Sequence, residues 1–239
     1  MSSISVSEAA RRLGVNVPRI HQRIADGSLR AERIGSQWVV DERSLLEVAE
    51  RRDAGRPLSM RSAWAVIAVS DGDDESLRRL APAERSRARQ RLQRLLSAAQ
   101  DRPAGEDAAR AIAVSLRSMF RKRADRRLFR IAPADVDDLR GDGRWQVLVD
   151  SAESGIASGD VEGYLAADEV EDLVKDFLLV PAVDGVGVVV HVVPQGQDPH
   201  PRSRLRLAAD LAEHRGPREE ARAAELLYEL ARERKPAAR

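Results

Sequence analysis

The sequence predicts an α+β protein with two domains, a small N-terminal one and a larger mixed one. Segment 53–58 contains Gly and Pro and separates two stretches with different patterns, so we place the domains at 1–52 and 59–235. Helical repeats dominate up to about residue 123, and short β-branched runs follow them. Hydrophobic residues make up 43% of the 239 residues, which is enough for a buried core.

Two short helices open the chain. Ser7 predicts the start of the first helix and Gly14 predicts its end, because these residue types are typical caps. The second helix should run over 17–25, with Pro18 in the first turn, where a missing N–H costs nothing. Its apolar side chains recur at the spacing of one helix face: Val17, Ile20 and Ile24.

A β-hairpin and a third helix complete the small domain. Asp26-Gly27 ends the second helix, and the runs 29–34 and 37–40 flank Gly35-Ser36, which is typical of a hairpin. Asp41 should cap a helix over 42–52. We expect the core to contain Ala10, Leu13, Ile20, Ile24, Leu29 and Trp38.

The larger domain begins with helices and continues with strands. Helical patterns are predicted over 60–70, 82–100, 107–123, 168–175 and 217–233. Short apolar runs predict strands over 128–132, 145–150, 177–182 and 186–193. We interpret Gly155, Gly159 and Gly163 as loop residues.

Charge is divided into two opposite blocks. The net charge is +1, yet residues 78–130 carry +11 and residues 131–185 carry −11. Such blocks pair with each other, or present one face to a polyanion and another to a cationic partner. We assign the acidic face around 168–176 to a cationic protein partner.

Three motifs of the small domain agree in order and spacing with one known family. These are SVSEAARRLGV at 5–15, DGSLRA at 26–31 and RIGSQWVV at 33–40. Residues 4–50 thereby resemble the winged helix-turn-helix domain of the excisionase and MerR-like group. The resemblance implies that the second helix recognises DNA and that the hairpin is a wing.

The residue chemistry agrees with that resemblance. Arg holds guanine and Gln reads adenine in the major groove, while Arg on a hairpin contacts phosphates or the minor groove. We therefore expect DNA contacts from Asn16, Arg19, His21, Gln22, Arg23, Arg30, Arg33 and Gln37. The alternative is that these side chains only solvate a small helical domain.

A basic stretch at 117–127 is a candidate second phosphate-binding surface. Its cationic residues are Arg117, Arg121, Lys122, Arg123, Arg126 and Arg127. The alternatives are that it packs against the acidic 131–185 region or solvates a helix end.

No enzyme pattern is present, so we expect neither catalysis nor a cofactor. The chain has no cysteine, and its four histidines lack the spacing of zinc ligands: His21, His191, His200 and His214. The carboxylates around 135–138 and 168–172 are typical of solvated helix starts.

A second resemblance concerns the C-terminal part. Residues 207–211, 216–221 and 224–227 are similar to the end of AbiE-type, or type IV, antitoxins. That family joins an N-terminal winged helix to an α+β antitoxin domain, and its toxin partner is a nucleotidyltransferase.

These observations predict a sequence-specific DNA-binding transcriptional repressor whose larger domain assembles it. One alternative is an antitoxin that represses its own operon, and another is an excisionase-like recombination factor. The expected partners are double-stranded DNA and either a second copy or a cognate protein. The N-terminus lacks a signal-peptide pattern and no apolar run is long enough to span a bilayer, so we expect a cytoplasmic, nucleoid-associated protein.

Overall fold

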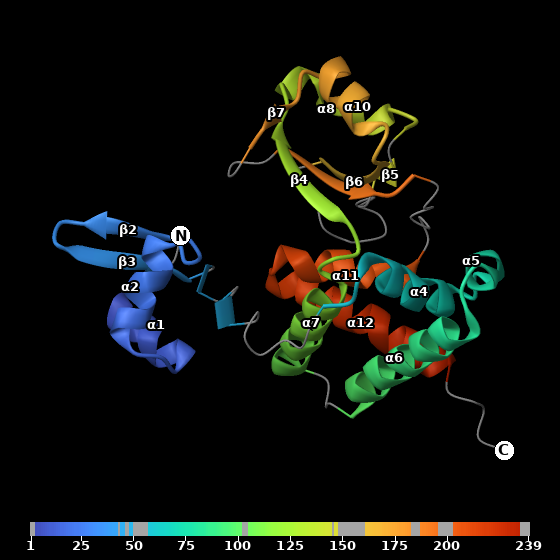
Figure 1. The fold of residues 1–239 in the computed structure, drawn as a ribbon, viewed down its shortest axis with the longest axis horizontal. Coiled ribbons are helices and arrows are strands. Elements are labelled where there is room, and N and C mark those ends of the chain that lie inside the picture. Colours follow the sequence, from blue (N-terminus) through green and yellow to red (C-terminus); the bar gives the residue numbers. More distant parts are fainter. Residues whose placement is uncertain are drawn as a thin grey trace. The chain divides into compact units, whose positions relative to one another are not determined.

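The computed structural model describes residues 3–42, 44–45, 48–49, 57–101, 105–144, 146–147, 161–182, 187–195 and 203–234. The chain separates into two compact units, Met1–Arg56 and Pro57–Arg239, and each is treated by itself below (Figure 1). Helices and strands occur in both units, which confirms the α+β class.

The described part of the N-terminal unit begins with helices α1 and α2 and a three-stranded antiparallel sheet. Its elements are β1 (Ser3–Ser5), α1 (Val6–Leu13), α2 (Val17–Ala25), β2 (Ala31–Ile34) and β3 (Gln37–Asp41). The strand order is β1-β3-β2. The described residues that follow are helical: Glu42, Ser44, Leu45, Val48 and Ala49.

Local capping explains where the two helices begin and end. The hydroxyl of Ser5 accepts a hydrogen bond from the Glu8 amide, so Ser5 caps α1 and the predicted start at Ser7 is wrong. Gly14 ends α1 with a φ of 60°, as the sequence predicts. Gly35 takes a φ of 64° at the turn between β2 and β3, which confirms the hairpin.

The small core gathers apolar side chains from every element of this unit. Its buried members are Val6, Ala9, Ala10, Leu13, Ile20, Leu29, Val40, Leu45 and Val48, and Ile24 and Trp38 are partly buried beside them. Val17, which the sequence places on the same helix face as Ile20 and Ile24, is 39% exposed. Only Ile20 and Ile24 anchor α2, which leaves the rest of this helix open.

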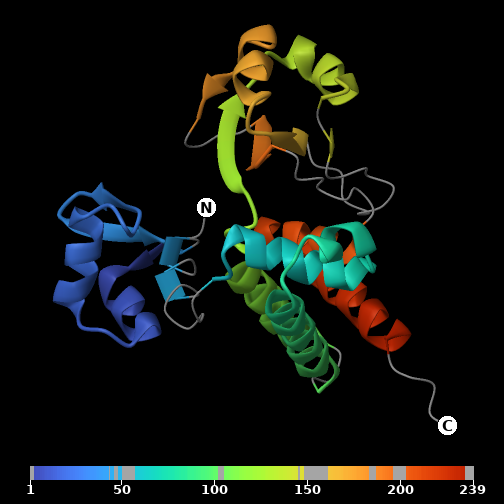
Figure 2. The ribbon, with the colours of Figure 1, turned by 45° about the vertical axis from the view of Figure 1, so that its right-hand side comes forward.

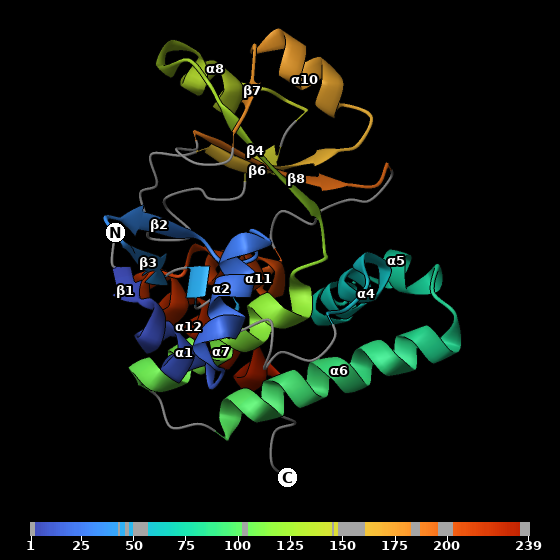
Figure 3. The same cartoon turned by 60° about the vertical axis from the view of Figure 1, so that its left-hand side comes forward.

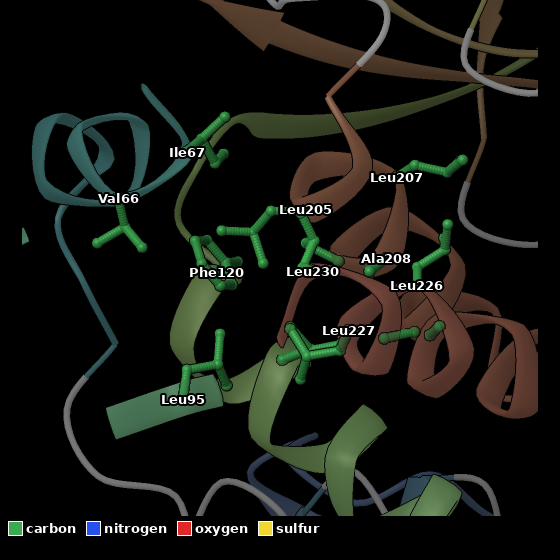
Figure 4. Close-up of a cluster of buried hydrophobic side chains, with 14 of the residues drawn as sticks. Val66, Ile67, Leu95, Phe120, Leu205, Leu207, Ala208, Leu226, Leu227 and Leu230 are labelled. Atoms are coloured by element: carbon green, nitrogen blue, oxygen red, sulfur yellow. The ribbon is translucent and has the colours of Figure 1, made fainter. Parts of the chain in front are cut away.

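In the larger unit a group of helices lies on one side of the sheet, and α8 (Val136–Gly141) and α10 (Val170–Asp176) lie on the other (Figure 2). The helices are α4 (Met60–Asp71), α5 (Asp74–Arg78), α6 (Pro82–Gln100), α7 (Glu106–Phe120), α11 (Arg204–His214) and α12 (Pro217–Glu233). Apolar side chains of α4, α6, α7, α11 and α12 converge in one core (Figure 4). The sequence predicts α4, α6 and α12 closely, whereas α5 and α11 are absent from the prediction.

The sheet has five strands in the order β5-β6-β8-β4-β7. The strands are β4 (Asp125–Arg130), β5 (Gln146–Val147), β6 (Val161–Ala166), β7 (Val180–Pro181) and β8 (Val188–Val193). β6 and β8 are parallel and joined through α10 (Val170–Asp176), while every other pairing is antiparallel.

The two faces of this sheet are covered differently. On one face Phe129, Leu165 and Val190 pack against α10 and against α8 (Val136–Gly141), which follows the 3₁₀ turn η1 (Pro133–Asp135). On the other face Tyr164 and Val193 join the helical core. Alternation along each strand therefore separates an apolar layer from a layer that contains the polar residues Glu162, Tyr164 and His191.

Several predictions differ from the structure in this region. The strand predicted over 128–132 is β4, Asp125–Arg130, and in the run 177–182 only Val180–Pro181 is a strand. The sequence does not predict strand β6, because Gly163 is typical of a loop, and α7 ends at Phe120 rather than at residue 123. The helix over 168–175 begins two residues later than predicted, at Val170. Gly155, Gly159 and part of the strand predicted over 145–150 lie outside the described residues.

Candidate nucleic-acid interface

Helix α2 is held against its unit by one face and exposes the other. Asn16 caps the helix, because its side-chain oxygen Oδ1 accepts a hydrogen bond from the Arg19 amide at 3.1 Å. Ile20 is completely buried between α1 and the sheet, and Arg19, His21 and Gln22 are exposed. Asn16, predicted as a DNA contact, therefore has a structural role already.

Two of the predicted base-reading residues lie side by side. The Arg19 guanidinium donates through Nη1 to Oε1 of Gln22 at 2.6 Å. This bond leaves other guanidinium N–H groups and the Gln22 amide N–H₂ as outward donors. Arg23, one turn on, is half-buried, and its carbonyl accepts hydrogen bonds from the Leu29 amide and the Ser28 hydroxyl.

The arginines of α1 and α2 differ in their electrostatic surroundings. Glu8 accepts hydrogen bonds from Arg12 and Arg11, which lower the pKa of this carboxyl. Within the part of the chain that the structure describes, Arg19 and Arg23 have no carboxylate in an ion pair. Asp26, at the C-terminal end of α2, interacts electrostatically with Arg23 and Arg19 without an ion pair. These two arginines are therefore less engaged than those of α1, which bind Glu8 directly.

The hairpin extends a second set of polar side chains. Arg33 lies opposite Trp38 in the ladder, and both Arg33 and Gln37 are exposed. Arg30 lies at the base of the hairpin, where its amide donates to the Ser44 hydroxyl at 2.9 Å. Ile34 at the tip is 65% exposed, and sequence reasoning overlooked it because an isoleucine in a strand is expected to be buried.

The second predicted phosphate surface is wrong for two of its six residues. Arg117 is buried and donates to the Ala212 carbonyl and to Glu220 of α12 at 3.0 Å. Arg123 is buried and pairs with Asp210 and Glu213 of α11. Neither guanidinium can reach a phosphate, because each is buried and already bound to carboxylates.

The other four residues of that stretch remain exposed: Arg121, Lys122, Arg126 and Arg127. Arg127 pairs with Asp125 at 3.1 Å. The carboxylates that bind Arg117 and Arg123 belong to α11 and α12 rather than to 131–185, so the predicted pairing with the acidic region is also wrong for these two. The remaining phosphate contacts stay a prediction.

A buried polar cluster between the sheet and α11 was not predicted. Glu162 of β6 is bridged by His191 of β8 at 2.6 Å and by His214 of α11 at 2.7 Å. Burial alone would raise the pKa of Glu162, but the hydrogen bonds from both histidines hold it well below its usual value. The hydrogen bond to Glu162 raises the pKa of His214.

The same cluster continues through Tyr164. Its hydroxyl donates to Asp210 Oδ1 at 2.9 Å and accepts from Arg123 Nε at 2.7 Å. No group of His, Asp or Glu in the described ranges has the arrangement of a metal site. The cluster attaches the sheet to the helices.

Comparison with known proteins identifies the N-terminal unit. Residues 4–53 match the family model of a helix-turn-helix domain, which confirms the excisionase-like resemblance over this segment. Neither the curated proteins nor the solved structures give a match. The chain therefore carries a DNA-binding helix-turn-helix domain at its N-terminus. No helix among the described residues is long and apolar enough to cross a membrane.

Proposed function

We propose that this protein is a transcriptional repressor that recognises a specific DNA sequence with α2 and contacts the flanking backbone with the β2–β3 hairpin as a wing. The observation that carries the proposal is the exposed face of α2, whose Arg19 and Arg23 form no ion pair within the described residues. Ile20 and Ile24 fix the helix to its core, and Arg19 and Gln22 point outward as a hydrogen-bonded pair.

This face has the chemistry of major-groove recognition. A guanidinium can donate two hydrogen bonds to O6 and N7 of guanine, and a Gln amide can donate and accept at N6 and N7 of adenine. Arg19 and Gln22 are three residues apart, so they address neighbouring bases. Arg33 and Gln37 on the hairpin supply phosphate or minor-groove contacts, and the exposed Ile34 tip suits the apolar wall of a groove.

The larger unit supports a regulator rather than a minimal recombination factor. A single head makes few phosphate contacts, so its affinity is modest unless two heads bind together. We assign dimerisation, or the binding of a cognate protein, to residues 59–235. Three leucines of the segments that resemble antitoxins, Leu207, Leu211 and Leu227, are buried in the helical core. If the protein is an antitoxin, as in the alternative, its toxin would have to bind other residues of the larger unit.

Selection of binding sites from a random duplex library with the full chain tests the proposal. The selected sequence should protect a defined footprint and should reduce transcription of a reporter when placed at its promoter. The variant Arg19→Ala, Gln22→Ala, Arg23→Ala should lose the preference for that sequence over a scrambled duplex. Each broken guanine contact should cost about 1–3 kcal/mol.

A matched control removes two charges from α1 instead. Arg11→Gln with Arg12→Gln should weaken binding to both duplexes alike and keep the preference, because these residues are engaged with Glu8. An unchanged preference in the α2 variant would exclude α2 as the recognition helix.

A further inference from the structure

Helix α6 has a buried side and a strongly basic side. Ala88, Leu92, Leu95, Leu96 and Ala99 are buried in the helical core, which fixes the rotation of the helix. Figure 3 shows α6 along the margin of the helical group. The opposite side therefore faces away from the core.

The segment 85–94 of this helix holds five arginines and no acid: Arg85, Arg87, Arg89, Arg91 and Arg94. Arg87, Arg91 and Arg94 recur at the i, i+4, i+7 spacing of one helix face, with Gln90 between them, and we call these four residues the α6 basic face. Arg87, Gln90 and Arg94 are exposed and Arg91 is half-buried.

The α6 basic face keeps most of its charge within the described residues, where only Glu84 interacts electrostatically with one of its arginines, Arg87. No ion pair joins its three arginines to a carboxylate there, although nearby arginines do have such partners. Arg61 pairs with Glu84 at 2.8 Å, and Arg79 pairs with Glu75 at 2.5 Å. Like charges at this spacing repel each other along a helix, so a bound anion would relieve a repulsion that the fold itself leaves in place.

We propose that the α6 basic face binds the phosphate backbone of duplex DNA, independently of base sequence. This inference rests on the proposed function, which makes duplex DNA the polyanion that this protein meets. Arginine donates paired hydrogen bonds to phosphate oxygens, and Gln90 can donate another. An acidic protein partner fits less well, because protein interfaces depend on apolar and aromatic anchors and this face presents none.

Salt-dependent binding of the full chain to a scrambled duplex tests the inference. Each lost phosphate contact should flatten the slope of log affinity against log salt by about 0.9. The variant Arg87→Gln, Arg91→Gln, Arg94→Gln should therefore flatten the slope by roughly 2–3 units and weaken binding at least about tenfold at ~50 mM salt. Its preference for the selected sequence over the scrambled duplex should stay that of the wild type.

The matched control is Arg110→Gln, Arg218→Gln, Arg232→Gln, which removes three exposed charges from α7 and α12. Its slope should stay close to that of the wild type, and circular dichroism should show that both variants are folded. If the α6 variant has the same slope of log affinity against log salt as this control, the inference is overturned. That holds even if the α6 basic face is then found to bind an acidic protein. If the wild type binds neither duplex, the proposed function and this inference both fail. If the α2 variant loses its sequence preference but the α6 variant keeps the wild-type salt slope, only this inference fails.

Discussion

Arg123 and Asp210 form an ion pair inside the larger unit, with Nη2 and Oδ1 2.5 Å apart and both side chains at most 1% exposed. Arg123 lies between α7 and β4, and Asp210 lies in the middle of α11. The Arg123 carbonyl also accepts a hydrogen bond from the Trp64 indole of α4 at 2.8 Å. One residue therefore connects three helices and the sheet.

Asp210→Asn should destabilise the larger unit strongly. The substitution leaves a buried guanidinium with less compensating charge, and breaking a buried pair in this way costs about 3–5 kcal/mol. Urea unfolding followed by tryptophan fluorescence measures the loss. Arg127→Gln is the control, because its exposed pair with Asp125 should contribute less than about 1 kcal/mol. Equal losses in the two variants would contradict a structural role for the buried pair.

The Glu162–His214 bond should make stability depend on pH. The pKa of His214 is raised above its usual 6.5, so its contribution is fully present below 6.5 and is lost as the pH rises through the folded value. The pKa of Glu162 is lowered from 4.5, so its contribution is present above 4.5 and is lost as the pH falls through the folded value. The Glu162–His214 bond therefore stabilises the fold most between about pH 4.5 and pH 6.5.

His214→Gln checks this dependence. The variant should lose more unfolding free energy at about pH 6 than at about pH 9, because the charged histidine is the form that Glu162 favours. Asp210 and Arg126 also act on His214, the first raising and the second lowering its pKa, so the measurement is made with both intact. A pH-independent loss in His214→Gln would rule out the charged bond.

Asn16→Ala should lower the stability of the N-terminal unit by about 1 kcal/mol, because the amide of Arg19 loses its cap. Asn16→Asp should retain the wild-type stability, since a carboxylate caps equally well. Thermal unfolding of the full chain measures both variants. If Asn16 instead contacts DNA directly, Asn16→Asp would weaken binding through repulsion from phosphate without changing the melting curve.

Arg33→Gln should weaken binding to operator and scrambled duplexes alike and flatten the salt slope by about 1 unit. Removing Arg30 as well should bring the change to roughly 2 units. Fluorescence anisotropy over a salt series gives the slopes. An unchanged slope in both variants would mean that the hairpin stays away from the backbone.

A fragment of residues 1–56 should fold, bind DNA far more weakly than the full chain and sediment as a monomer. Its apolar core is drawn from its own elements, which is what independent folding needs. Circular dichroism, anisotropy and sedimentation measure the three properties. Equal operator affinity of the fragment and of a monomeric full chain without a co-purifying partner would exclude an assembly role for residues 59–235.

Local sequence signals predict the N-terminal unit well. Gly14, Pro18 and Gly35 each fix a backbone feature by themselves, so helix ends and the hairpin turn follow from single residues. Strand β1 could not be predicted in this way, because three residues pair with β3 only after the hairpin has formed. The α2 face is predicted by its polar pattern, whereas the Arg19–Gln22 hydrogen bond needs coordinates.

The larger unit resists prediction because its signals are non-local. Arg117 and Arg123 belong to a basic stretch, and nothing in that stretch tells that they are buried by carboxylates some ninety residues later. Strand β6 contains Glu162 and Gly163, two residue types that are uncommon in a buried strand. They are tolerated here because two histidines bind Glu162 and because β6 pairs with a neighbouring strand. Charge composition alone therefore cannot tell the two buried arginines from the four exposed cationic residues of the same stretch.

The helical core joins α4, near the start of the larger unit, to α11 and α12 at the end of the chain. Helix α4 packs most extensively against α6, which follows it soon in the chain, and less extensively against α11. A ribosome adds about 5–20 residues per second, so the side of α4 that contacts α11 waits on the order of ten seconds for that helix. The core of the N-terminal unit is formed by residues of that unit alone, so the unit can fold while the remainder of the chain is being synthesised. During that interval the apolar side of α4 that contacts α11 has no partner, and such transiently exposed apolar surface is what chaperones bind during synthesis.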